Sequence, residues 1–346
     1  MAAAFALLLA FVASPTPAAQ APVYTITNLG TLGGTRSSAF SINTSGQVAG
    51  YAETADGKPH AFVYLGGSLF DLGTLGGADS YAYQISDSGF VIGRSQNASG
   101  RYRPFVTILN SPMFDISSLD AHLGGAFSVA IGINGSGQVV GYFHTATEHM
   151  AARNRVFLYS DHTLTDLGTF GGEDAIVTAI NNSGQIVGSY GIEAQADYAH
   201  RRAFLYSAGN LIDLGSLGGK VTAAADLNDS GQVIGHAQTS SGVFHAFLYD
   251  DGAISDLGTL PGGNQSLAYS INNAGQVVGA SDSAASSMRA FIYSGGVMRD
   301  LNALIQANSG WTLSEARGIN NAGQIVGTGD LNGQQRAFLL TPVASP

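Results

Sequence analysis

Hydrophobic and polar residues recur in one phrase that appears seven times along the chain. In its common form, an apolar residue and Asn precede two turn residues and then Gly-Gln-apolar-apolar-Gly. The first glycines of consecutive copies lie 43 to 48 residues apart, and they are Gly46, Gly89, Gly137, Gly184, Gly231, Gly275 and Gly323. Repetition with this period is typical of solenoids, propellers and other arrays of similar units.

Two further phrases accompany the first. A His or Arg stands two residues before a Phe in every copy, as in His60-Ala-Phe62. An Asp follows about eleven residues later in six copies, in an Asp-Leu-Gly phrase or a variation of it. Short apolar segments bounded by Gly, Asn and Ser predict strands joined by tight turns. In the second unit the predicted strands are Tyr81 to Ser86, Phe90 to Gly93, Arg103 to Ile108 and Met113 to Ile116.

Four short antiparallel strands per unit predict the blade of a β-propeller. The seventh unit ends after its third strand, Arg336 to Leu340, whereas residues 24–30 supply a fourth-strand phrase with no strands before it. Pairing of these two segments would leave no sheet edge open at the seam. We therefore predict an all-β, seven-bladed β-propeller, closed by pairing of the N-terminal strand with the last blade.

The cation of the second phrase and the Asp of the third are eleven or twelve residues apart in six units. A two-residue turn at Leu65-Gly66 would place His60 opposite Asp71 and Phe62 opposite Leu69. A pair repeated in every blade is typical of a structural element, because a ring normally uses a functional site once. We expect at least four of the six pairs to lie at salt-bridge distance within one blade, each contributing under about 1 kcal/mol.

The phrases resemble the HAF repeat of bacterial extracellular proteins. The resemblance rests on His-Ala-Phe, on Asn-x-x-Gly-Gln-Val-Val-Gly and on Asp-Leu-Gly-Thr-Leu-Gly-Gly, and it covers roughly residues 24–340. It implies an exported bacterial protein without a defined biochemical role. It brings no catalytic residues to this sequence.

Composition favours many short buried strands over helices or disorder. Only 11% of residues are Asp, Glu, Lys or Arg, whereas 47 residues are Gly and 45% are hydrophobic. The net charge of −10 argues against nucleic acid as a partner, because phosphate binding needs a basic face. The absence of Cys from the sequence excludes disulfides, thiolate metal sites and Cys nucleophiles. We expect no cofactor and no metal.

Residues 1–21 have the character of a secretory signal peptide. An apolar run from Ala2 to Ala13 is followed by small residues and prolines, although no Lys or Arg precedes it. The run is too short to span a bilayer, and no later stretch reaches that length. We expect an exported monomer, extracellular or periplasmic, whose residues 22–346 form a single propeller domain without a membrane span.

Two local motifs are similar to metal sites, and both have a simpler explanation. Residues 226–231, Asp-Leu-Asn-Asp-Ser-Gly, are similar to an acidic calcium loop, but the other six copies lack the leading acid. Turn chemistry explains their Asn and Gly. His144, Glu148 and His149 have the composition of a zinc-hydrolase motif but not its spacing, and we expect them in a solvated loop.

We expect a non-catalytic binding or surface-interaction module for a carbohydrate or a protein. The first strand of each unit should line the channel, where Ser41, Gln84, Ala179 and Ser270 are small or uncharged. The alternative is a secreted propeller enzyme, such as a glycan hydrolase or lyase, which would gather carboxylates near the mouth of the channel.

Loop length locates the expected binding surface. Nine residues (51–59) precede the cation in the first unit, but thirteen do so in the third (142–154) and in the fourth (189–201). Variable loops on a constant scaffold commonly carry binding specificity. The residues we expect to contact a ligand are His122, His144, Glu148, His149, Arg153, Glu193, Asp197, Tyr198 and His200. Tolerated surface insertions are the alternative.

Overall fold

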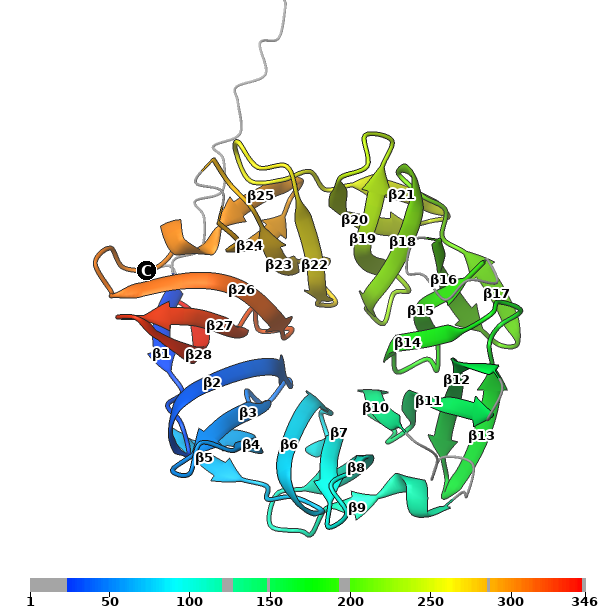
Figure 1. Cartoon of the computed structure of the whole chain (residues 1–346). Helices are drawn as coiled ribbons and strands as arrows, with labels where there is room; N and C mark the ends of the chain where they lie inside the picture. The colour runs from blue at the N-terminus through cyan, green and yellow to red at the C-terminus, as the bar shows by residue number, and fades with distance from the viewer. Residues whose placement is uncertain (1–23, 120–126, 148–149, 193–199, 285–286, 344–346) are drawn as a thin grey trace, which may run out of the picture.

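The computed structural model describes residues 24–119, 127–147, 150–192, 200–284 and 287–343. They form seven four-stranded antiparallel sheets arranged as a ring (Figure 1). This confirms the predicted seven-bladed β-propeller. The predicted signal peptide, residues 1–21, lies outside the described residues. No helix in the described part of the chain is long and apolar enough to cross a membrane.

Each blade is numbered here by its order in the chain, and its strands are given from the centre of the ring outward. Blade 1 contains β2 (Gly33–Ile42), β3 (Val48–Thr54), β4 (Pro59–Leu65) and β5 (Ser68–Asp71). Blade 2 contains β6 (Gly76–Ile85), β7 (Phe90–Asn97), β8 (Tyr102–Ile108) and β9 (Phe114–Asp115), followed by a 3-10 turn, η1 (Ile116–Leu119). Blade 3 contains β10 (Ser128–Ile133), β11 (Val139–Thr147), β12 (Met150–Ser160) and β13 (Thr163–Gly168).

The remaining blades repeat this order. Blade 4 contains β14 (Ala175–Ile180), β15 (Ile186–Gly191), β16 (Arg201–Ser207) and β17 (Asn210–Asp213). Blade 5 contains β18 (Gly218–Leu227), β19 (Val233–Thr239), β20 (Phe244–Asp250) and β21 (Ala253–Asp256). Blade 6 contains β22 (Ser266–Ile271), β23 (Val277–Ser281), β24 (Arg289–Ser294) and β25 (Val297–Asp300), followed by η2 (Leu301–Ala303).

Blade 7 combines both ends of the described chain. Its strands are β26 (Trp311–Ile319), β27 (Ile325–Leu331), β28 (Gln334–Pro342) and, outermost, β1 (Tyr24–Asn28). Figure 1 shows β1, in blue, beside the red C-terminal strand. Tyr24 lies opposite Pro342 and Asn28 lies opposite Phe338. The predicted closure of the ring is therefore confirmed.

The Gly that ends each central phrase lies where two strands come closest. A Cβ on Gly235 would lie 2.0 Å from the carbonyl oxygen of Ala223 on the neighbouring strand, and the other six copies give 1.9 to 2.1 Å. No side chain fits there. Opposite each of these glycines stands the Phe of the second phrase. These rings are fully buried: Phe62, Phe105, Phe157, Phe204, Phe247, Phe291 and Phe338.

The Asn of the central phrase joins neighbouring blades. The Nδ2 of Asn228 donates to the carbonyl oxygen of Asn272 in the next blade at 3.2 Å, and the same bond recurs from five other blades at 2.9 to 3.1 Å. The donors are Asn43, Asn134, Asn181, Asn228, Asn272 and Asn320, all buried. Blade 2 carries Ser86 at this position, so the ring of bonds is open between blades 2 and 3.

The predicted register of the outer hairpins is wrong by two residues. The turn of blade 1 is Gly66-Gly67, with both residues at positive φ, so Asp71 lies opposite Phe62 and not opposite His60. Because side chains alternate with a period of two, the shift keeps His60 and Asp71 on one face as diagonal neighbours. The first predicted strand of blade 2 also begins earlier than expected, at Gly76.

Candidate binding site

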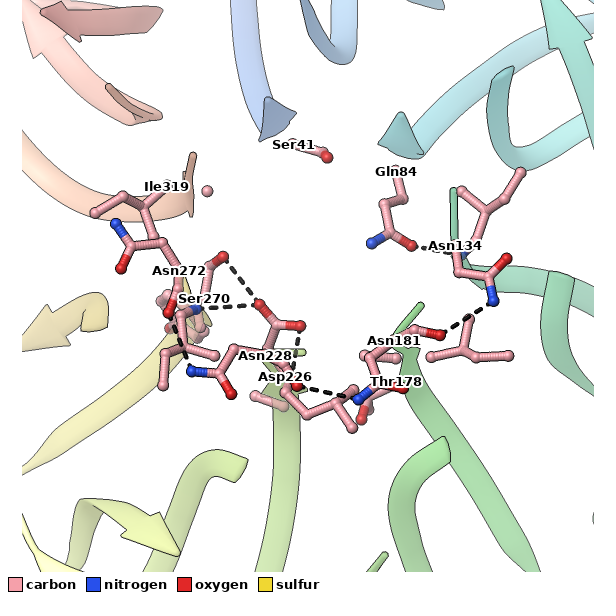
Figure 2. Close-up of a pocket in the computed structure, with 18 of the residues that line it drawn as sticks. Ser41, Gln84, Asn134, Thr178, Asn181, Asp226, Asn228, Ser270, Asn272 and Ile319 are labelled. Carbon is pink, nitrogen blue, oxygen red and sulfur yellow. Dashed lines mark hydrogen bonds between the residues drawn. The ribbon is translucent and has the colours of Figure 1, made fainter. Parts of the chain in front are cut away.

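A cavity of about 650 Å³ lies at the centre of the ring, where the innermost strands of all seven blades meet. Its lining comes from these strands and from the turns that follow them, as Figure 2 shows for ten labelled residues. The residues expected to line the channel, Ser41, Gln84, Ala179 and Ser270, all do so.

A β-bulge in every innermost strand shapes the wall of the cavity. The pairing register shifts at the same position of each blade, for example between Ala39 and Ser41. A bulge leaves one residue unpaired and breaks the alternation of side chains. Consecutive residues such as Phe40 and Ser41 therefore both line the cavity.

The second residue of each bulge forms what we call the turn level: Ser41, Gln84, Gly132, Ala179, Asp226, Ser270 and Gly318. Three of its side chains accept a hydrogen bond from a backbone N–H of another blade. Ile85 N donates to Ser41 Oγ at 3.3 Å, and Ile133 N donates to Gln84 Oε1 at 2.6 Å. The turn level thus links blades as well as lining the cavity.

Asp226 is the acidic residue of the turn level. One carboxylate oxygen accepts from Ser270 Oγ at 3.0 Å and from Ile271 N at 3.1 Å, and the other accepts from Leu227 N at 2.9 Å. Burial in the channel wall, which these hydrogen bonds only partly offset, raises the pKa of Asp226 to about 6. This places its titration close to neutral pH.

The residue before it in each strand forms the middle level, and here the ring is asymmetric. Blades 6, 7, 1 and 2, which are neighbours, carry Tyr269, Arg317, Phe40 and Tyr83. Blades 3, 4 and 5 carry Ile131, Thr178 and Ala225. One half of the wall is therefore aromatic and cationic, while the other half is small or aliphatic.

The aromatic half is held by contacts between its own members. The Phe40 and Tyr83 ring centroids are 6.2 Å apart, and the Arg317 guanidinium lies 4.2 Å from the centroid of Tyr269. Arg317 Nη2 is also 2.7 Å from Glu315 Oε2. Burial raises the pKa of Tyr83 to about 12 and raises that of Tyr269, so both phenols are protonated at neutral pH.

Of the expected ligand-contacting residues, three lie within the described part of the chain: His144, Arg153 and His200. The other six lie outside it: His122, Glu148, His149, Glu193, Asp197 and Tyr198. The expected loop of blade 3 is largely strand, because β11 continues to Thr147 and β12 begins at Met150. His144 thus lies in a strand and not in a solvated loop, and its ring centroid is 5.0 Å from that of Phe127.

Ion pairs tie this part of blade 3 to blade 4. Arg153 Nη1 lies 2.5 Å from Glu173 Oε2, in the segment that leads into blade 4. Asp174, next in that segment, accepts from Asn154 at 3.4 Å and pairs with Arg201 at 2.9 Å. The structure brings Arg153 to the boundary between the two blades.

The repeated cation and Asp form ion pairs within their blades, as predicted. The distances are 2.9 Å for His60 and Asp71, 2.8 Å for Arg155 and Asp166, 2.8 Å for His245 and Asp256, and 3.2 Å for Arg289 and Asp300. Four of the six pairs therefore meet the expected criterion. Each Asp also caps the following turn where the phrase continues with Leu-Gly, as Gly73 N donates to Asp71.

The middle level was missed by sequence reasoning, although a signal for it exists. Aligned on the Asn of the central phrase, the position three residues before it is aromatic or Arg in four blades and small or aliphatic in three. In a chain of near-identical units, such a position is where a single site would differ from the scaffold. Among the described residues, no cluster of three or more His, Asp or Glu side chains is arranged to hold a metal ion.

The fold and its lined channel define the protein as a closed seven-bladed β-propeller with a central cavity. Within that class, residues 218–339 match the family described as Protein of unknown function (DUF3466). The match covers blades 5 to 7 and does not supply the HAF-repeat name suggested by the sequence phrases. No curated protein matches the chain.

Solved structures share the fold at low sequence identity. The β-propeller domain of the Trilobed protease from Pyrococcus furiosus is 12% identical, with a TM-score of 0.57 over 77% of this chain and 83% of that one. An acylaminoacyl peptidase from Pyrococcus horikoshii is 11% identical, with a TM-score of 0.58 over 89% of this chain and 52% of that one. A puromycin-hydrolyzing peptidase from Mycobacterium tuberculosis is 11% identical, with a TM-score of 0.60 over 95% of this chain and 56% of that one. This chain thus spans about half the length of the two peptidases, and the likeness concerns the fold alone.

Proposed function

We propose that the protein is a non-catalytic binding module that takes a carbohydrate into its central cavity. The asymmetry of the middle level is the observation that carries this proposal, because Tyr269, Arg317, Phe40 and Tyr83 interrupt an otherwise repetitive ring. A binding pocket typically combines an apolar, aromatic wall with a few polar groups that orient the ligand.

The chemistry of the wall suits a sugar. A pyranose ring has an apolar face of C–H groups, which packs on aromatic rings such as Phe40 and Tyr83. Its hydroxyls need partners that both donate and accept, and the protonated phenols and the amide of Gln84 supply such groups. A volume of about 650 Å³ falls within the range common for small-molecule pockets.

Glycan hydrolysis is the rival proposal, and Asp226 is the observation that favours it. A carboxyl group with a pKa of about 6 suits general acid catalysis. Glycosidases generally need a second carboxylate about 5 to 10 Å from the first. Asp87 and Asp229 also line the cavity, but each accepts hydrogen bonds from a neighbouring blade. The oxygens of Asp226 are also engaged by three protein donors, which favours a structural role.

We also propose that the protein acts outside the cytoplasm, on the strength of the signal-like residues 1–21. The face of blades 3 and 4 that carries Arg153 and His200 is a second proposed contact surface. Substituting Arg153 by Gln and His200 by Ala would test this surface, because shortening residues 142–154 would remove parts of β11 and β12. Binding should be lost while the melting temperature stays close to that of the original chain, and an unchanged affinity would remove the surface from the site.

A glycan array and a peptide array probed with residues 22–346 test the proposal, run beside a hydrolase and lyase screen on the same glycans. We expect glycan binding without turnover, and loss of the signal in Tyr269→Ala. The Ile108→Ala variant, on the outer part of blade 2, is the matched control and should bind like the original chain. Turnover abolished by Asp226→Asn, or binding to peptides alone, would contradict the proposal.

A further inference from the structure

An aromatic cluster continues from the cavity wall between blades 1 and 2 towards the end of the channel opposite the turn level. Phe40 contacts Tyr51 with ring centroids 5.8 Å apart, and Tyr51 meets Tyr81 edge-on at 5.2 Å. Tyr81 lies 6.5 Å from Tyr102. We call Tyr51, Tyr81, Tyr83 and Tyr102 the tyrosine cluster. Because Tyr83 also lines the cavity, the cluster and the cavity share one wall.

Arg94, on β7, lies among these rings. Its guanidinium carbon is 4.6 Å from the centroid of Tyr102, 5.0 Å from that of Tyr81 and 5.9 Å from that of Tyr83. Arg is found once at this position of the repeat, since the other blades carry Tyr51, Tyr142, Ser189, His236, Ala280 and Thr328. The position therefore varies between blades, and blade 2 is where it carries an Arg.

One hydrogen-bond donor of Arg94, its Nε, has no acceptor among the described residues. Its Nε is buried and without a partner, and no ion pair involves the side chain, whereas Arg36, Arg155, Arg201, Arg289 and Arg317 each pair with an acid. The nearby carboxylate of Asp79 instead accepts a hydrogen bond from Tyr102 Oη at 3.1 Å. Aromatic faces attract the cation but cannot accept the N–H groups, which lie in the guanidinium plane.

A buried donor without an acceptor costs free energy, and such a cost is common where a ligand supplies the missing group. A guanidinium matches the planar, two-oxygen edge of a carboxylate. A phosphate would bring close to two negative charges against one cation, next to Asp79, and would leave charge uncompensated in a partly buried site. The geometry therefore favours an anion with a single charge.

The rings around the cation limit the class of ligand further. Burial raises the pKa of Tyr81 and of Tyr83 to about 12, so at neutral pH their phenols are neutral and do not compensate the charge of Arg94. The net charge of −10 disfavours long-range capture of a polyanion. Recognition must be local, through one carboxylate attached to a body that packs on aromatic rings.

We propose that Arg94 and the tyrosine cluster bind the carboxylate of an acidic sugar, a uronic acid, whose ring packs against Tyr81 and Tyr83. This rests on the proposed binding of a carbohydrate in the cavity and names its class. In this arrangement Arg94 donates two hydrogen bonds to the carboxylate. Tyr51 and Tyr102 border the same site.

Calorimetric titration with galacturonate, which carries one carboxylate, and with its neutral counterpart galactose tests the proposal. Galacturonate should bind more tightly than galactose. Arg94→Gln should weaken the galacturonate about ten- to a hundredfold, the equivalent of losing a charge-assisted hydrogen bond, and should leave neutral sugars unaffected. Arg101→Gln, which changes an exposed Arg of the same blade, is the control and should bind like the original chain. Thermal melting verifies that each variant is folded.

The outcomes separate this inference from the proposed function. Equal affinity of Arg94→Gln and the original chain for galacturonate would overturn the inference. Loss of neutral-glycan binding in Tyr269→Ala would still support the cavity as a sugar site. The assignment of a sugar acid as the ligand would be overturned if a galactose phosphate or a peptide carboxylate bound more tightly than galacturonate and lost its binding in Arg94→Gln. Failure of every glycan to bind would remove both proposals.

Discussion

A single Asn in each repeat holds a turn and joins two blades. In blade 5, Asn228 Oδ1 accepts from Ser230 N and from Gln232 N, each at 3.1 Å. Its Nδ2 donates to Gln232 Oε1 at 2.7 Å and to the carbonyl of Asn272 in the next blade. Both donors and both acceptor sites of the side-chain amide are therefore in hydrogen bonds, which explains why Asn and Gln recur four residues apart in the phrase.

Asp226 should make the stability of the protein depend on pH. Its pKa of about 6 in the folded state exceeds the value of about 4 expected when unfolded. The folded state therefore holds the proton more tightly, so the stabilising contribution of this group is fully present below about pH 4 and is lost as pH rises from about 4 to 6. The Asp226→Asn variant should gain at most about 3 kcal/mol over the original chain at pH 7 and little at pH 4.

Denaturant unfolding at several pH values measures this difference, with Asp229→Asn as the control of opposite sign. Burial opposes ionisation of Asp229, but hydrogen bonds from Asn273 and Asn182 outweigh it and lower its pKa. Its contribution is present above pH 4 and is lost as pH falls through the folded pKa. Asp229→Asn should therefore destabilise the protein at pH 7. A gain from Asp226→Asn that is equal at pH 4 and pH 7 would contradict the account.

At the scale of the element, the turn after each innermost strand is the joint between blades, and the joint of blade 2 is incomplete. Ser86 accepts a hydrogen bond from Asn43 but has no Nδ2 to donate to the carbonyl of Asn134. Ser86→Asn would supply the missing donor and should raise stability by about 1 kcal/mol. Thermal melting measures the change.

The reverse substitution provides the comparison. Asn228→Ser leaves the carbonyl of Asn272 and the Oε1 of Gln232 without their donor, and it should cost about 1 to 3 kcal/mol. If Asn228→Ser had no effect, or if Ser86→Asn lowered the melting temperature, these bonds would not be what joins the blades.

The strands themselves show what sequence reasoning could and could not predict. Apolar alternation and turn residues were enough to place four strands in each blade. They did not place the bulge, because the two-residue period carries no sign of an inserted residue until the strands pair. Strict alternation assigns Tyr83 and Gln84 to opposite faces, yet both line the cavity. The turn at Gly66-Gly67 was missed by one position for a similar reason, since either dipeptide could form a two-residue loop.

At the scale of the whole molecule, seven hydrophobic clusters lie between adjacent blades, so each blade is stabilised mainly by its neighbours. The pairing of β1 with β28 closes the ring of blades. It could be predicted from the sequence because the strand missing at one end is present at the other. The candidate site could not be predicted from the sequence. Loop length directed attention to blades 3 and 4, whereas the asymmetry of the wall depends on which side chains converge at the centre.

Removal of residues 24–30 tests closure. The deletion exposes the edge of β28 and removes Tyr24 and Leu29, both buried, from the seam. The melting temperature should fall sharply, and the unpaired edge should promote aggregation. Substitution of Thr25 and Thr27 by Ser, in the same strand, is the control and should have little effect. A deletion variant as stable as the original chain would show that the ring does not need this strand.

The most direct test of the account compares the two halves of the cavity wall. The affinity of a glycan identified on the array would be measured by calorimetry for Tyr83→Ala and Tyr269→Ala, and for Ile131→Ala and Thr178→Ala on the opposite side. The account predicts that the first two variants lose binding at least tenfold, while the second two bind within about threefold of the original chain and all four remain folded. Equal losses on both sides, or no loss at Tyr83 and Tyr269, would contradict the claim that the aromatic half of the wall is the binding site.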